Sequence, residues 1–97
     1  MAEIVLGIGT SHGPMLSTPW EQWNQRAEFD RRNPEQWYRG KTYDFEQLVE
    51  LRKNDGLALQ ITPEKWRERA AACEAALEVL AAKFAEAAPD VAVIVGN

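Results

Sequence analysis

The sequence of 97 residues has little of what several classes of protein depend on. Its one cysteine, Cys73, excludes an internal disulfide and a cysteine-rich zinc site. Acidic residues outnumber lysine and arginine by 15 to 11, and the net charge of −4 argues against binding along a nucleic-acid backbone. No apolar run approaches the ~20 residues that cross a bilayer. We therefore expect one small cytoplasmic unit with neither a nucleic-acid nor a membrane partner.

Two short apolar runs predict strands near the two ends of the chain. Residues 3–8 have the sequence EIVLGI, and residues 91–95 have the sequence VAVIV. Both runs are rich in β-branched residues and continuous rather than alternating, which is typical of parallel strands covered on both faces by helices. We expect these runs to be buried, neighbouring strands of one sheet.

The clearest helix pattern begins after Thr62 and ends near residues 87–88. Thr62 is a good N-cap, Pro63 suits the first helical position, and Glu64 complements the helix dipole. Pro89 prevents the helix from continuing. Apolar side chains recur at steps of three and four and form one stripe, which we expect to be buried together with the cysteine thiol: Trp66, Ala70, Cys73, Leu77, Leu80 and Phe84.

The middle of the chain has a weaker pattern. Thr18 is followed three positions later by Glu21, a capping box that predicts a short helix. Asp44 and Gln47 repeat this spacing and predict a second helix. Residues 28–41 lie between the two and have no steady apolar period, so they predict an ordered loop.

A strand, a long helix and a second strand predict an α/β fold, in which the helix is the crossover of a βαβ unit. Two strands cannot protect both faces and both edges of a sheet. We therefore expect residues 1–97 to be a single partial domain, the N-terminal βαβ-type portion of a larger helix-flanked sheet domain. A further segment, a partner chain or a second copy would complete it. The alternative is a small domain that is stable by itself.

The only histidine, His12, lies in a glycine-rich turn after the first apolar run. Gly7 and Gly9 begin a dinucleotide-binding pattern, G-x-G-x-x-G, but its last position is His12. A catalytic pair of Ser11 and His12 is also unfavourable, because adjacent residues of an extended segment point to opposite sides. A histidine just past the carboxyl end of a strand stands where α/β proteins bind ligands. His12 is therefore a candidate metal ligand, and a hydrogen-bonded structural histidine is the alternative.

The sequence GIGTSHGPML at residues 7–16, taken with PDVAVIVGN at residues 89–97, resembles the class III extradiol aromatic-ring-cleaving dioxygenases. The likeness is to the catalytic subunit of the protocatechuate 4,5-dioxygenases and to the gallate and 3-O-methylgallate dioxygenase subgroup. In this family the first strand runs into a Ser-His-x-Pro turn, whose histidine binds iron and corresponds to His12. The second strand is followed by Asn-Asp-His, of which this chain has the asparagine, Asn97.

This resemblance implies a non-haem Fe(II)-dependent extradiol dioxygenase in a homo-oligomer, with His12 as an iron ligand. The substrate would be a catechol-type aromatic acid, and O₂ would be the co-substrate. Such iron sites use two histidines and one carboxylate. One histidine can supply only one of these ligands, so the 97-residue chain alone is expected to be inactive. Two alternatives stay open, a catalytically silent relative with a structural or subunit-forming role, and an unrelated α/β domain that binds a small ligand at the same edge.

Basic and aromatic residues gather between the two shorter predicted helices. Arg31, Arg32 and Arg39 are candidates for pairing with the carboxylate of an aromatic acid. Acidic neighbours balance their charge, so a solvated surface of mixed charge is the alternative. Four tryptophans are candidates for the walls of an aromatic pocket, with packing as the alternative: Trp20, Trp23, Trp37 and Trp66.

Overall fold

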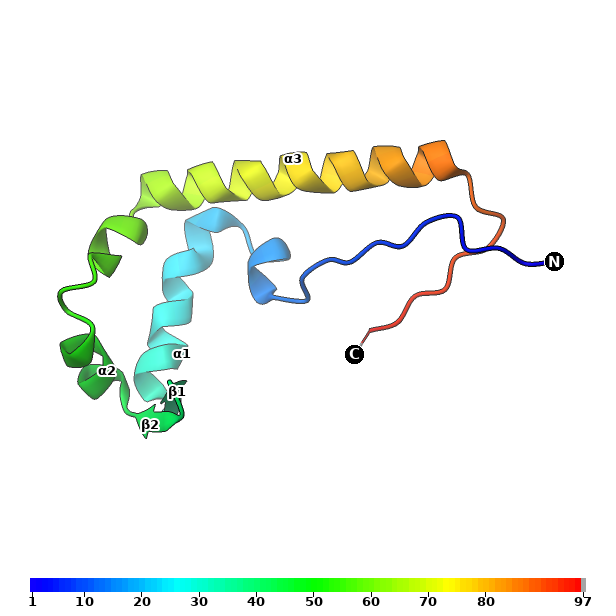
Figure 1. The fold of residues 1–97 in the computed structure, drawn as a ribbon. Coiled ribbons are helices and arrows are strands. Elements are labelled where there is room, and N and C mark those ends of the chain that lie inside the picture. The colour runs from blue at the N-terminus through cyan, green and yellow to red at the C-terminus, as the bar shows by residue number, and fades with distance from the viewer. Residues whose placement is uncertain (97) are drawn as a thin grey trace.

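The computed structural model describes residues 1–96, which form helices and a small antiparallel sheet (Figure 1). The helices are α1 (Arg26–Arg32), α2 (Phe45–Leu51) and α3 (Pro63–Ala87). The strands are β1 (Gln36–Tyr38) and β2 (Lys41–Tyr43). Short 3₁₀ helices occupy Pro14–Leu16, Trp20–Gln25 and Leu57–Gln60. This content agrees with a mixed α/β class.

Both ends of α3 follow from the local sequence, as predicted. Thr62 is the N-cap, and its Oγ1 accepts a hydrogen bond from the backbone N–H of Lys65 at 3.3 Å. At the other end Ala88 adopts the left-handed conformation with φ 44°, and Pro89 follows it. Although α3 has 25 residues, neither it nor any other helix within residues 1–96 is apolar enough to span a membrane.

The capping box predicted at the start of α2 is confirmed. The Oδ1 atom of Asp44 accepts a hydrogen bond from the backbone N–H of Gln47 at 2.8 Å. The Oε1 atom of Gln47 accepts one from the backbone N–H of Asp44 at 3.0 Å. These reciprocal bonds satisfy two backbone donors that have no partner inside the helix.

The capping box predicted at Thr18 is wrong. Pro19 takes the N-cap position of the 3₁₀ helix Trp20–Gln25 and receives no side-chain hydrogen bond. Since Pro19 is extended, with ψ 137°, the helix begins one residue later than the box requires. The carbonyl oxygen of Thr18 instead accepts a hydrogen bond from the indole Nε1 of Trp23 at 3.0 Å.

Residues 28–41, predicted to be a loop, contain the end of α1 and most of a β-hairpin. In this hairpin Tyr38 pairs with Lys41, the last residue pair before the turn. Arg39 and Gly40 close it with φ values of 50° and 80°, as a two-residue type I′ turn requires. The strands have three residues each, too few to show an alternating pattern in the sequence.

The two predicted strands are corrected by the structure. Residues 3–8 and 91–95 are neither strand nor helix, and β1–β2 is the one sheet within residues 1–96. A strand needs a neighbour for its backbone hydrogen bonds, and the described residues provide none to these segments. In Figure 1 both segments run in the direction opposite to α3.

No residue in the described part of the chain is fully buried. The accessible surface is 8587 Å², whereas a compact protein of 11.0 kDa exposes about 5,600 Å². The helix α3 packs against Trp20–Gln25, and this contact leaves Trp66 and Ala70 half-buried. Cys73, predicted to be a buried thiol, is exposed because the packing covers only part of the stripe.

Candidate functional site

His12 lies in an exposed turn between the N-terminal segment and the 3₁₀ helix Pro14–Leu16. The Oγ atom of Ser11 accepts a hydrogen bond from the backbone N–H of Gly13 at 3.0 Å. Such a serine turn ties the side chain to the backbone two residues later. His12 therefore lies between Ser11, whose side chain is hydrogen-bonded, and the start of a short helix, and it is exposed to solvent.

Gly13 has a close neighbour where a side chain would begin. A Cβ atom at this position would lie 3.1 Å from the Oγ atom of Ser11, closer than side-chain atoms normally approach. The backbone of Gly13 is extended, with φ −65° and ψ 146°, so other residues could adopt its conformation. The glycine therefore makes room for the hydrogen bond of Ser11.

The described residues do not form a complete metal site. Between residues 1 and 96 no group of three histidine, cysteine, aspartate or glutamate side chains is placed to hold a metal ion. A non-haem iron of the expected type needs three protein ligands on one face. His12 can be one of these ligands, and the others would have to come from elsewhere. Asn97, where the second ligand element of the resembled family begins, lies outside the described residues.

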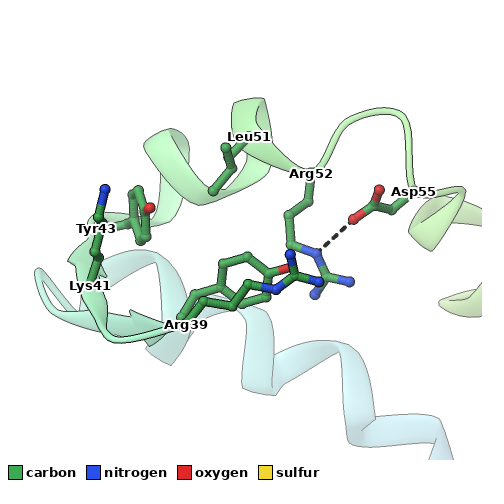
Figure 2. Close-up of a pocket in the computed structure, with 7 residues that line it drawn as sticks. Arg39, Lys41, Tyr43, Leu51, Arg52 and Asp55 are labelled. Carbon is green, nitrogen blue, oxygen red and sulfur yellow. Dashed lines mark hydrogen bonds and ion pairs between the residues drawn. The ribbon is translucent and has the colours of Figure 1, made fainter.

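A second candidate site, which we name the hairpin pocket, lies between the β1–β2 hairpin and the end of α2 (Figure 2). It has a volume of about 470 Å³. Three of its lining side chains are cationic, one is a carboxylate, and the rest are aromatic or apolar: Tyr38, Arg39, Lys41, Tyr43, Leu51, Arg52 and Asp55.

Two guanidinium groups meet at the ring of Tyr38. The Cζ atom of Arg52 lies 4.9 Å from the ring centroid, and that of Arg39 lies 5.3 Å from it. Both distances are those of cation–π contacts. Nε of Arg52 also donates a hydrogen bond to Oδ2 of Asp55 at 2.8 Å. This hydrogen bond raises the pKa of Arg52 above its usual value.

The turn of the hairpin decides where the Arg39 side chain lies. Arg39 has φ 50°, a left-handed conformation that type I′ turns usually assign to Asn, Asp or Gly. Figure 2 shows its side chain extending toward Arg52. Lys41 and Tyr43 stand at the opposite side of the pocket.

The structure separates the three arginines that the sequence groups together. Arg39 lines the hairpin pocket, whereas Arg31 pairs with Glu28 at 2.6 Å on the surface of α1. Arg32 is exposed at the end of α1 and does not line the pocket. Arg52 belongs to the pocket but was not singled out from the sequence. Its spacing of three residues from Asp55 could have predicted the ion pair, but not the place of Arg52 beside Tyr38.

The four tryptophans do not line the hairpin pocket. Trp37 is 74% exposed. The others are half-buried around the contact between α3 and Trp20–Gln25 or beside it: Trp20, Trp23 and Trp66. Packing, the alternative stated for them, is the role that the described residues give these three.

Comparisons with protein-family models, with curated proteins and with solved structures find no significant match to this chain. The functional inference therefore depends on the residues of the two sites, the turn around His12 and the hairpin pocket.

Proposed function

We propose that this chain is part of a non-haem Fe(II)-dependent extradiol ring-cleaving dioxygenase, with His12 as one of the iron ligands. The substrate would be a catechol-type aromatic acid, and O₂ the co-substrate. The observation that carries the proposal is the turn Ser11-His12-Gly13-Pro14. Its backbone is tied by the Ser11 hydrogen bond, and His12 is exposed. If the other iron ligands come from different segments, the histidine must be accessible to them and must be held in a defined turn.

The direction of the chain supports the larger α/β domain that this proposal includes. Residues 3–8 and 91–95 both run against α3, which is the sense that a βαβ unit gives to two parallel strands and their helix (Figure 1). Their apolar side chains are open, with Ile4 at 91% and Ile94 at 92% exposure. Segments of this composition fit strands that other parts of a helix-flanked sheet cover on both faces.

The iron chemistry belongs to the completed protein. The described residues offer His12 as a ligand and hold no second imidazole, so no chemical step can be assigned to them alone. The missing imidazole and carboxylate would come from a further segment, a partner chain or another copy in a homo-oligomer. His12 would contribute a neutral nitrogen ligand, with Ser11 and Gly13 holding its turn in place.

Iron binding by the full protein tests the proposal. The protein is loaded with Fe(II) without oxygen, its bound iron is measured, and O₂ uptake is followed after protocatechuate or gallate is added. His12→Ala is expected to lower the iron affinity at least about 100-fold, since it removes a ligand rather than a supporting group. Ring cleavage, visible as a yellow product, should be lost with it.

Ser11→Ala is the matched control, because it changes the same turn but keeps the imidazole. It should lower the iron affinity by at most about tenfold, far less than His12→Ala does, because it loosens the turn without removing a ligand. A His12→Ala protein with normal iron content and turnover would show that His12 is not a ligand. A wild-type protein that binds no iron would instead favour the catalytically silent relative.

A further inference from the structure

We propose that the hairpin pocket binds a small organic molecule through a doubly charged oxyanion, either a phosphate monoester or two neighbouring carboxylates. The pocket is lined by three cationic side chains and one carboxylate, which leaves an excess of two positive charges. The rest of the protein carries a net negative charge, so this excess is local. A site of this kind attracts small dianions. The inference does not depend on iron or on His12.

The cationic groups of the pocket have donors to spare. Asp55 accepts a hydrogen bond from Nε of Arg52, which leaves the two terminal nitrogens of that guanidinium outside this bond. Arg39 and Lys41 form no ion pair within residues 1–96. Guanidinium groups present paired N–H donors that match the oxygens of carboxylate and phosphate. The pocket thus offers more charged donors than its own residues use.

Arg39 occupies a backbone position that does not suit it. Its φ of 50° lies in the left-handed region, where the Cβ atom of an L-residue causes strain and Asn or Gly is preferred. Strain of this kind concentrates at functional sites, where the side chain compensates for it. At Arg39 the turn brings the guanidinium to the same Tyr38 ring that Arg52 contacts, and this placement compensates for the backbone strain.

The volume of the pocket indicates a ligand larger than the anion itself. About 470 Å³ is more than a phosphate or carboxylate group fills. Tyr43 and Leu51 supply a less polar wall, and Lys41 stands beside Tyr43 at the side opposite to the arginines (Figure 2). The anion would lie at Arg39 and Arg52, with the remainder of the molecule toward Tyr43.

The hairpin pocket is separate from the turn around His12. In Figure 1 the hairpin lies at the far end of α1, whereas the segment with His12 precedes the 3₁₀ helices that lead into α1. A molecule in the hairpin pocket would therefore be a second ligand of this chain.

Titration with small anions tests the proposal directly. Inorganic phosphate and succinate represent the two dianions, acetate is the matched monoanion, and ionic strength is held constant with NaCl. Backbone amide resonances of residues 38–43 and 52–55 are expected to shift saturably with at least one dianion. Acetate should bind at least tenfold more weakly. Saturation by phosphate alone or by succinate alone would identify the preferred group.

Three variants separate recognition from folding. Arg39→Asn removes the guanidinium but suits the left-handed turn, so it should bind the dianion about tenfold more weakly while its Tm stays the same or rises. Arg52→Gln should weaken binding by a similar factor. Arg67→Gln, an exposed arginine on α3 outside the pocket, is the matched control and should bind as the wild type does. The proposal is overturned if neither dianion saturates, if acetate binds equally well, or if Arg39→Asn keeps full affinity.

Discussion

The turn around His12 depends, residue by residue, on the small side chains that flank it. The Oγ atom of Ser11 reaches the backbone N–H of Gly13 because nothing stands at the Cβ position of residue 13. Gly13→Ala should weaken this hydrogen bond by about 0.5–1.5 kcal/mol, the usual net value of one such bond. Amide hydrogen exchange at residue 13 is then expected to become several-fold faster, as it should in Ser11→Ala.

Gly9→Ala is the control for this prediction. A Cβ at Gly9 would meet no atom within 4 Å, so exchange at Gly13 should not change. Equal exchange at residue 13 in wild type and Gly13→Ala would show that the Ser11 hydrogen bond does not hold the turn.

Arg52 gives a prediction about pH. Its hydrogen bond to Asp55 raises its pKa above the value expected in the unfolded chain. A group whose pKa is raised on folding contributes its full stabilisation below the unfolded pKa and loses it only above that value. The loss of stability caused by Arg52→Gln should therefore be the same at pH 6 and pH 8. Urea unfolding of both proteins at the two pH values measures this, and a loss that shrinks toward pH 8 would contradict it.

The sequence predicts the candidate residues better than their partners. His12 and Arg39 can be selected from composition and local pattern, and the structure leaves His12 accessible and brings Arg39 into a pocket. Arg52 and Asp55 cannot be selected this way, since they meet Tyr38 only after the hairpin has formed and turned toward α2. The contact between Tyr38 and Arg52 depends on two turns of the chain, and no single spacing in the sequence predicts how the two turns combine.

At the scale of elements, the C-terminal part of α3 gives predictions of opposite sign for two alanines, one at the C-cap and one inside the helix. Ala88 has φ 44°, where an L-residue is strained and glycine is not. Ala88→Gly should therefore raise the free energy of unfolding by about 0.5–1 kcal/mol. Ala82→Gly, inside the same helix, should lower it by about 1 kcal/mol. Thermal unfolding of the two variants measures both changes, and a loss of stability in Ala88→Gly would contradict the left-handed cap.

Helix starts that depend on nearby side chains are predicted correctly at Thr62 and Asp44, but not at Thr18, where the extended Pro19 moves the start by one residue. Thr62 and Asp44 form their bonds with backbone N–H groups three residues later, so the caps of α3 and α2 are visible in the sequence. The strands predicted at residues 3–8 and 91–95 depend instead on neighbours that must arrive from elsewhere. Composition indicates that such segments favour strand, but only a partner strand can complete their hydrogen bonds.

The whole molecule is extended for its length. Its radius of gyration is 18.4 Å, whereas a compact chain of 97 residues has about 12.5 Å. The long α3 keeps much of its apolar stripe open, with Leu77 and Phe84 exposed beside Cys73. The chain exposes about 3,000 Å² more than a compact protein of its mass, and obligate interfaces bury about 2,000–5,000 Å². The larger domain proposed above would cover it.

The open surface leads to a quantitative prediction for unfolding. The denaturant m-value is proportional to the surface that unfolding exposes. An unfolded chain of 11.0 kDa exposes about 16,000 Å². Since the folded chain already exposes 8587 Å², unfolding exposes about 7,400 Å² more. A compact protein of the same mass would expose about 10,300 Å² more on unfolding. The 97-residue chain should therefore unfold in urea with about seven-tenths of the m-value typical of its length.

If copies of the chain cover one another's apolar surface, the m-value and the midpoint should rise with protein concentration. A full m-value that does not vary with concentration would contradict both expectations, because it would require the isolated chain to bury a core of its own.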